Sequence, residues 1–291
     1  MGEHVARHAA AEGKWRVAGT FLGNPIAIPG VATVGVDLSD AAAAGRLIRD
    51  MRPAAVIHCA AATNGAWCEA NPAPAHAAIV GATANLCAAM GRWTPAAPLI
   101  ALSTDLVFDG ESAPYAEDAP AKPIGVYGSL KLAAEEPVRA MEHGCVLRSA
   151  LVYGPPATHR APFLGWMIEA LGRGGPLDLF RDEWRTPVMV DDLAEAMGLL
   201  LAHRAKWAGG AIFHAGGADR LSRVEMGRKL CAVFGLPPGG IRETERAAAP
   251  GGAQRPRDVS LRHDRLATLG WKPTTFDEGL IRCRNRWNSP R

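Results

Sequence analysis

The chain of 291 residues is 48% hydrophobic and 21% charged, and its formal net charge is +3. This length allows one large α/β domain or one domain with a smaller lobe, and so weak a charge argues against nucleic acid or an anionic membrane surface as a partner. The N-terminus lacks the apolar run of a signal peptide, and no apolar stretch approaches the roughly 20 residues that span a bilayer, so we expect a cytoplasmic protein.

The front half of the chain alternates between strand and helix patterns. Short apolar runs predict strands at 15–20, 31–36, 54–59, 98–103 and 145–149. Helices are expected at 2–12, at 40–51 with Ser39 or Asp40 as the cap, at 72–92, and in the segment that carries Tyr127. This alternation predicts right-handed βαβ units in a Rossmann-like, doubly wound parallel sheet.

After about residue 150 the pattern loosens, and proline, glycine and tryptophan become frequent. We expect a helix at 162–172, a strand at 184–190, a helix to about 203 capped by Asp191 or Asp192, a strand at 211–214 and a helix at 222–235. These elements indicate a smaller lobe built from the C-terminal half.

Tyr127 and Lys131 carry the strongest chemical signal. Residues four apart share one face of a helix, so the ammonium can lie near the phenol and lower its pKa from about 10. A tyrosine tuned in this way can exchange a proton with a carbonyl or an alcohol. The spacing alone is weak, and the plain alternative is an exposed tyrosine and lysine on a helix.

Two hydroxyl residues support the chemical interpretation. Ser103 and Thr104 lie at the carboxyl end of the apolar strand expected at 98–103. Ligands of open α/β sheets collect at the carboxyl ends of strands, where such a hydroxyl can bond a substrate oxygen beside Tyr127. The alternative is a simple turn or helix cap.

The motif STDLVFDG at 103–110, followed by Pro123-x-x-x-Tyr127-Gly-x-x-Lys131, resembles the extended short-chain dehydrogenases/reductases. It resembles especially the dTDP-4-dehydrorhamnose reductase branch of this family. Further segments agree with this family in order along nearly the whole chain, at 56–62, 147–154, 185–194, 255–261 and 266–271.

This resemblance implies roles for named residues. Thr104 would orient the substrate carbonyl, Tyr127 would donate the proton, and Lys131 would bind the nicotinamide ribose and lower the tyrosine pKa; these three form the expected catalytic set. Asp37 would contact the adenine. The implied cofactor-binding residues are Gly2, Thr20, Asp37, Leu38, Ala60, Ala61, Ala62, Ser103, Tyr127 and Lys131, and the implied substrate-binding residues are Ser103, Thr104, Arg185 and Arg255.

The resemblance also implies a division of the chain. Residues 1–152 would form the dinucleotide-binding domain without its first strand, and 153–291 mainly the substrate lobe, with segments near 186–215 returning to the first domain. The family opens with a strand and a G-x-x-G-x-x-G loop, of which only Gly2, as the third glycine, has a match. In the strand order 3-2-1-4-5-6 the absent strand is central, so we expect an interruption between the strands at 15–20 and 54–59.

Three explanations for this start stay open. In the first, the recorded start lies downstream of the true one. In the second, the protein is short, with a remodelled sheet and weak or no cofactor binding. In the third, another segment, for instance from a second subunit, fills the place of the strand.

The cofactor would be NADPH or NADH. An acidic residue at the end of the second strand favours NAD, but Val17–Asn24 contains none. It contains no arginine for a 2′-phosphate either, and the absence of the acid gives a slight preference for NADPH.

The other polar residues suggest little further chemistry. The six cysteines form no CxxC pair and are expected to be free thiols, and His58 is expected to be a satisfied interior histidine. No His/Asp/Glu cluster suggests a metal. Arginines crowd the C-terminal region, where they either clamp a diphosphate or form a solvated face.

The predicted function is an NAD(P)H-dependent reductase of a nucleotide-linked keto-deoxysugar, with a homodimer as one expected form. Two alternatives stay open. One is a non-catalytic regulatory protein that binds a sugar nucleotide or dinucleotide, a use of this fold represented by the regulatory subunit of methionine adenosyltransferase. The other is a sugar-nucleotide epimerase. Dehydration is disfavoured because Thr104 is followed by Asp105 and Leu106, whereas dehydratases of this fold carry an Asp-Glu pair there.

Overall fold

A computed structural model describes residues 1–155, 163–248 and 255–287. The chain divides into two compact units. Unit 1 consists of Met1–Val107, Pro120–Arg148 and Ala194–Phe213, and unit 2 consists of Phe108–Ala119, Ser149–Leu193 and His214–Arg291. Residues 108–119, which the sequence assigned to the first domain, thus belong to unit 2, where Tyr115 forms backbone hydrogen bonds with Ser260 and Arg262.

The main sheet of unit 1 has the strand order β10-β5-β4-β3, with β10 at Ala211–Ala215, β5 at Gly144–Ser149, β4 at Leu99–Thr104 and β3 at Val56–His58. Strands β3 and β4 are parallel, with Val56 opposite Leu99 and Ile57 opposite Ile100. Every residue of β5 is buried, as expected for an apolar strand covered on both faces. The predicted Rossmann-like parallel sheet is confirmed.

Strands β1 (Ala18–Phe21) and β2 (Ala32–Gly35) form a second, parallel sheet of their own. In the described part of the chain, β1 and β3 therefore belong to different sheets, which confirms the predicted interruption between them. All four residues of β2 are exposed, unlike the strands of the main sheet.

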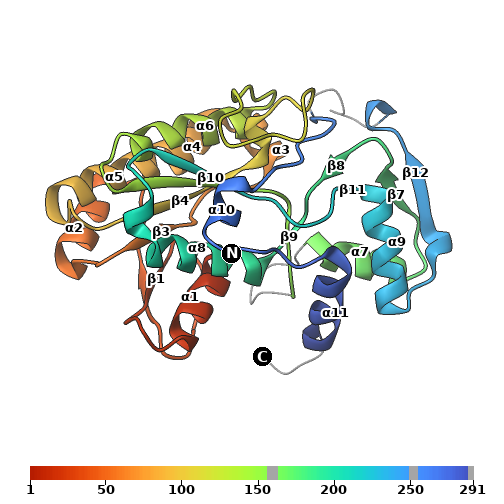
Figure 1. The fold of residues 1–291 in the computed structure, drawn as a ribbon, viewed down its shortest axis with the longest axis horizontal. Helices are drawn as coiled ribbons and strands as arrows, with labels where there is room; N and C mark the ends of the chain where they lie inside the picture. The colour runs from red at the N-terminus through yellow and green to blue at the C-terminus, as the bar shows by residue number, and fades with distance from the viewer. Residues whose placement is uncertain (156–162, 249–254, 288–291) are drawn as a thin grey trace. The chain divides into compact units, whose positions relative to one another are not determined.

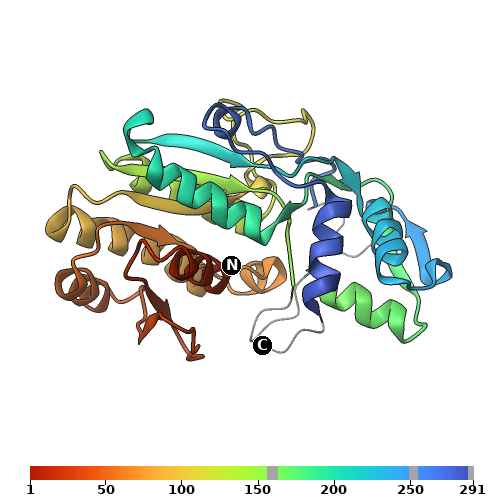
Figure 2. The same cartoon turned by 60° about the horizontal axis from the view of Figure 1, so that its bottom comes forward.

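Helices cover both faces of the main sheet. Helices α2 (Ala41–Met51), α5 (Ala82–Trp93) and α6 (Val126–Arg139) pack side by side on one face, while α1 (Gly2–Ala11) and α8 (Val190–Ala202) lie on the other (Figures 1 and 2). The side chain of Asp40 accepts hydrogen bonds from the amides of Ala42 and Ala43, so Asp40, and not Ser39, caps α2. Ile48, Leu86, Met90 and Leu99 are among the buried residues of the core between these layers.

The helical run Pro72–Trp93 corrects one expectation. It consists of α4 (Pro72–His76), a π-helical turn η1 (Ala77–Gly81) and α5, and α3 (Gly65–Ala70) precedes it. Its 22 residues are long and apolar enough to cross a membrane by length and composition, so the statement that no apolar stretch is long enough was wrong. Core helices of soluble proteins share this length and composition, and Ile79, Leu86 and Met90 of this run are buried.

Unit 2 is built from short strand pairs and helices. The strand pairs are β6 (Val152–Tyr153) with β9 (Val188–Met189), β8 (Trp184–Arg185) with β11 (Leu221–Ser222), and β7 (Leu177–Phe180) with β12 (Ile241–Thr244). The helices are α7 (Phe163–Gly172), α9 (Arg223–Phe234), α10 (Asp264–Thr268) and α11 (Phe276–Trp287), and short 3₁₀ turns lie at 105–107, 204–206, 238–240 and 246–248. Tyr153, Leu164, Met189 and Phe276 are part of their common core.

Two local predictions in unit 2 were wrong and one was confirmed. The single strand expected at 184–190 is split into β8 and β9 around Pro187, which has no N–H to donate to a ladder. Helix α8 already begins at Val190, so Asp191 and Asp192 lie in its first turn and not at its cap. The helix expected at 222–235 is α9, which Ser222 caps in a full capping box with Glu225. Residue 162, the expected first residue of α7, lies outside the described residues.

Candidate functional site

Thr104 stands at the carboxyl end of β4, where the sheet ends and the 3₁₀ turn η2 (Asp105–Val107) begins. Its hydroxyl donates to Asp105 Oδ1 over 3.0 Å and accepts the amide of Leu106 over 3.2 Å. The side chain is therefore held in one orientation at the strand end. This is the place at which open α/β sheets bind their ligands.

Tyr127 and Lys131 lie on α6, which packs against β4 and η2. The Lys131 ammonium donates to the carbonyl of Leu102 over 2.6 Å. Burial lowers the pKa of Lys131 to about 8, although the negative charge of Glu135 acts in the opposite direction. The ammonium remains mostly protonated at neutral pH.

The expected lowering of the Tyr127 pKa is contradicted. Burial raises the pKa of this phenol, and the negative charge of Asp105 raises it further. The ammonium of Lys131 donates its hydrogen bond to the Leu102 carbonyl. Its positive charge does not offset the effect of burial on the pKa of the phenol. The raised pKa keeps Tyr127 protonated, which is the state that a proton donor requires.

Gly128 allows α6 to approach η2 closely. A Cβ at this position would lie 2.2 Å from the backbone carbonyl oxygen of Leu106. The glycine next to Tyr127 thus sets the distance between the helix and the end of β4.

We expect Gly128→Ala to reduce the free energy of unfolding by about 1–3 kcal/mol, because the backbone of η2 must move. Gly91→Ala on α5 is the matched control, since a Cβ there meets nothing within 4 Å. It should be neutral or stabilising by up to about 1 kcal/mol. Denaturant unfolding of both variants measures the difference, and equal stabilities would contradict the close approach.

The hydroxyl proton of Ser103 is already used in a hydrogen bond within the protein. Its hydroxyl donates to Glu135 Oε1 over 2.6 Å, and Glu135 also forms two hydrogen bonds with Arg148, of 3.0 and 2.7 Å. In this arrangement Ser103 can offer a ligand its oxygen lone pairs but not its proton. The sequence reasoning missed both Glu135 and Arg148.

The residues predicted to hold the adenine end lie after β2. Asp37 is exposed, and hydrogen bonds from the amide and hydroxyl of Ser39 lower its pKa. The side chain of Leu38 is buried against Ala44 and Ala82, so only its backbone can face a ligand. Asn85, which the sequence reasoning did not single out, donates to the carbonyls of Leu38 and Ser39 and fixes this loop. Thr20 is exposed on β1.

The end of β3 brings further predicted residues together. A Cβ on Gly2 would lie 3.7 Å from Cys59 Cβ, so the start of α1 is next to the segment that carries Ala60–Ala62. Ala60 is exposed, whereas Ala61 and Ala62 pack against the apolar cluster that includes Tyr127. His58 is buried and bonds Thr83 Oγ1 over 3.1 Å, which confirms the satisfied interior histidine.

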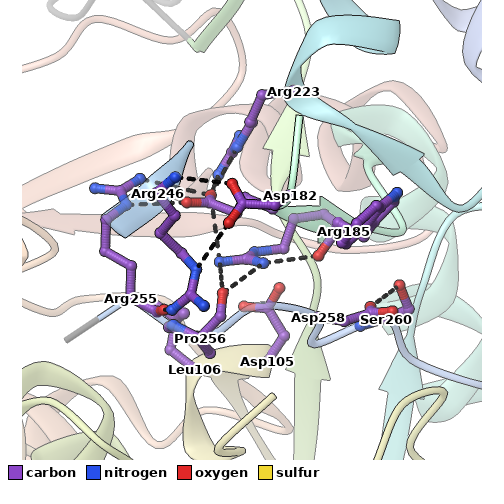
Figure 3. A network of polar contacts seen from close by, with 12 residues as sticks. Asp105, Leu106, Asp182, Arg185, Arg223, Arg246, Arg255, Pro256, Asp258 and Ser260 are labelled. Carbon is purple, nitrogen blue, oxygen red and sulfur yellow. Dashed lines mark hydrogen bonds and ion pairs between the residues drawn. The ribbon is translucent and has the colours of Figure 1, made fainter. Parts of the chain in front are cut away.

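Unit 2 contains the two predicted arginines. Arg185 and Arg255 both contact Glu183, which is fully buried, over 3.3 and 2.9 Å, and Arg223 contacts the same carboxylate over 2.7 Å. Figure 3 shows Arg185, Arg223 and Arg255 converging from three directions. The sequence reasoning missed Glu183 and Arg223. Three guanidinium groups thus surround one buried carboxylate.

Comparisons with known proteins identify the family to which the chain belongs. Residues 2–288 match the family model described as RmlD substrate binding domain. The chain is 33% identical to dTDP-4-dehydrorhamnose reductase of Mycobacterium tuberculosis, over 94% of this chain and 85% of that protein. It is 31% identical to dTDP-4-keto-6-deoxy-D-glucose reductase of Streptomyces niveus, over 82% and 81%.

The chain is also similar to a protein that is named for a different function and to a solved reductase structure. The chain is 31% identical to methionine adenosyltransferase 2 subunit beta of Mus musculus, over 84% of this chain and 74% of that protein. Among solved structures, dTDP-4-dehydrorhamnose reductase of Bacillus anthracis in complex with NADP superposes with a TM-score of 0.80 at 22% identity, covering 92% of this chain and 97% of that one. At this identity the superposition shows a common fold.

Proposed function

Because the chain belongs to the RmlD substrate binding domain family, we propose that it is an NAD(P)H-dependent reductase of a nucleotide-linked keto-deoxysugar. One observation carries the proposal. Thr104 at the end of β4 and Tyr127 and Lys131 on the adjoining helix α6 supply a hydroxyl, a protonated phenol and an ammonium to one end of the sheet.

Each of the three residues has a distinct task in this reaction. NAD(P)H, when bound, supplies the hydride that reduces the keto carbon. Tyr127 gives its phenolic proton to the oxygen that becomes the hydroxyl, and Thr104 orients that oxygen through the donor that it now directs at Asp105. Lys131 carries a positive charge below about pH 8 and can hold the ribose hydroxyls and stabilise the developing phenolate.

The residues that follow β2 and β3 and those that open α1 suit a dinucleotide. Asp37 is exposed beside a loop fixed by Asn85, and the small residues Ala60–Ala62 allow close approach of the backbone. Gly2 opens α1 next to this segment, and a helix N-terminus suits a pyrophosphate. We propose NADPH or NADH as cofactor, with preference for NADPH because the stretch Val17–Asn24 contains no acid.

The substrate diphosphate suits the arginine cluster of unit 2. Guanidinium groups form bidentate hydrogen bonds with phosphate oxygens, and Arg185, Arg223 and Arg255 bring three of them together at Glu183. We extend the predicted substrate contacts of Arg185 and Arg255 to Arg223. We further propose that the protein works in the cytoplasm, without nucleic-acid or membrane partners, and that a homodimer is one of its forms.

The first experiment is a titration of the 291-residue protein with NADPH and NADH, followed by calorimetry and tryptophan fluorescence. We expect micromolar binding of at least one of them. Oxidation of the bound cofactor should then follow addition of a dTDP-4-keto-6-deoxysugar. Binding without oxidation across a panel of keto-sugar nucleotides contradicts the reductase, and no binding at millimolar concentration contradicts the cofactor as well.

A non-catalytic regulatory role is the second candidate. Similarity to the beta subunit of methionine adenosyltransferase 2 supports it, and so does the interruption between β1 and β3 in the nucleotide-binding half. Ligand binding without turnover would favour this role. An epimerase would instead interconvert sugar nucleotides without net oxidation of the cofactor.

A further inference from the structure

A buried glutamate continues the functional face of α6. Tyr127, Lys131 and Glu135 follow one another at intervals of four residues and so lie along one side of the helix. Glu135 has a relative exposure of 2%. Nothing in the reaction proposed above uses this carboxylate.

Glu135 joins α6 to two neighbouring strands of the main sheet. Its Oε1 accepts the Ser103 hydroxyl of β4 over 2.6 Å and Arg148 Nε of β5 over 3.0 Å. Its Oε2 accepts Arg148 Nη2 over 2.7 Å. The pair with Arg148 is bidentate, and the arginine is also only 2% exposed, so the carboxylate is held rigidly.

Stability alone gives little reason for such a pair. Two buried charges lose their hydration, and well-packed apolar residues of similar volume are often as stable or more so. A buried polar network does specify one arrangement of the groups that it bonds. The groups bonded here adjoin the proposed catalytic residues.

The end of β4 is tied to α6 at two successive residues. Lys131 Nζ bonds the carbonyl of Leu102, and Glu135 bonds the hydroxyl of Ser103. Thr104 is the next residue along the strand. The two bonds therefore fix the position of Thr104 relative to the helix that carries Tyr127.

We propose that Glu135, anchored by Arg148, is a positioning residue for the reduction: it holds the end of β4 against α6 and supplies the counter-charge of the buried Lys131 ammonium. The inference rests on the proposed function, because it assigns the role to the same site.

Several other groups act on this part of the site. Cys59, after β3, is a titratable group near Lys131, but burial raises the pKa of its thiol to about 11 and the thiol is neutral where Lys131 titrates. Burial and the charge of Lys131 lower the pKa of His58. Asp105 in η2 raises the pKa of Tyr127, and Cys68 in α3 is a further titratable group near this phenol. Of the groups that raise the pKa of Lys131, Glu135 has the larger effect, so removing its charge must make the ammonium lose its proton at lower pH.

The test uses Glu135→Gln, which keeps the size and an acceptor for Ser103 but removes the charge. Glu136→Gln is the matched control, since this neighbour on α6 is exposed. Glu135→Asp retains the charge and should restore part of the function. The double variant Glu135→Gln/Arg148→Met removes both buried charges and serves if the single variant fails to fold.

Two measurements are made on each folded variant. The first is kcat as a function of pH; we expect Glu135→Gln to lower kcat by about 10- to 100-fold near neutral pH with little change in KM for the sugar nucleotide. Its basic limb should move to lower pH. The second is carbon-13 NMR of the lysine Cε signals, of which the chain has six, with Lys131 assigned by Lys131→Arg.

The NMR titration does not depend on turnover. In the wild type the Lys131 signal should titrate near pH 8, and in Glu135→Gln at lower pH. An unchanged Lys131 titration overturns the proposal, and so does an unchanged kcat in an enzyme that turns over. A wild type without turnover overturns the proposed reductase, while the Lys131 titration alone still decides whether Glu135 is its counter-charge.

Discussion

Replacing Tyr127 by phenylalanine is expected to abolish turnover and to leave cofactor affinity within a few-fold of the wild type. The phenol is the proton donor, and loss of a positioned acid costs about 10²–10⁴ in rate. The ring itself packs in the apolar cluster with Cys68, Ala75 and Ile79, and phenylalanine preserves these contacts. Single-turnover oxidation of NADPH and a calorimetric titration of the cofactor measure the two effects separately.

Tyr153→Phe is the matched control. This tyrosine is buried in the core of unit 2, and within the described residues its hydroxyl has no hydrogen-bond partner. Removing an unsatisfied buried hydroxyl should leave turnover unchanged and stability equal or slightly higher. Substantial residual turnover in Tyr127→Phe would remove this residue from the mechanism and assign the proton donor to another group, whereas a wild type that binds ligand without turnover would favour the regulatory role.

Local sequence patterns predicted the framework of the site because its elements depend on neighbours in the chain. The apolar run before Ser103 predicted β4, the Asp40 cap predicted the start of α2, and the spacing of Tyr127 and Lys131 placed them on one helix. Each of these signals is a matter of periodicity or capping within a few residues.

The charged networks could not be predicted in the same way, because their partners come from distant parts of the chain. Glu135 meets Arg148 from β5, and Glu183 meets Arg223 and Arg255 from segments 40 and 72 residues away. A weaker signal did exist. Arg148 interrupts an otherwise apolar buried strand, and a charge in such a strand calls for a buried partner. Glu135 continues the four-residue spacing of Tyr127 and Lys131.

The wrong prediction for the Tyr127 pKa has a related cause. The four-residue spacing of Tyr127 and Lys131 predicts that they share a helix face. It does not predict how deeply they are buried or which acceptor the Lys131 ammonium bonds. Lys131 bonds the Leu102 carbonyl, and burial decides the direction of both pKa shifts. Desolvation depends on the packing of the whole unit, which a five-residue motif does not determine.

Glu183→Gln is expected to destabilise the protein by about 3 kcal/mol near neutral pH. Burial alone raises the pKa of Glu183, but the charges of Arg223, Arg185 and Arg255 outweigh it and lower the pKa from 4.5 to about 2. Each pKa unit corresponds to about 1.4 kcal/mol, and the side chain is fully buried, so solvent screens little of this effect. The amide cannot neutralise the three guanidinium groups that remain.

The pH dependence gives the sign of this effect. Because the folded pKa lies below the unfolded one, the stabilisation by Glu183 is complete above about pH 4.5 and is lost as the pH falls toward 2. Denaturant unfolding of wild type and Glu183→Gln should therefore differ most near neutral pH and converge in acid, where the protonated glutamate resembles glutamine. Asp178→Asn, which breaks an exposed pair with Arg242, should change stability by less than about 1 kcal/mol. A difference between wild type and Glu183→Gln that persists unchanged to acid pH would mean that the glutamate acts through packing and not through its charge.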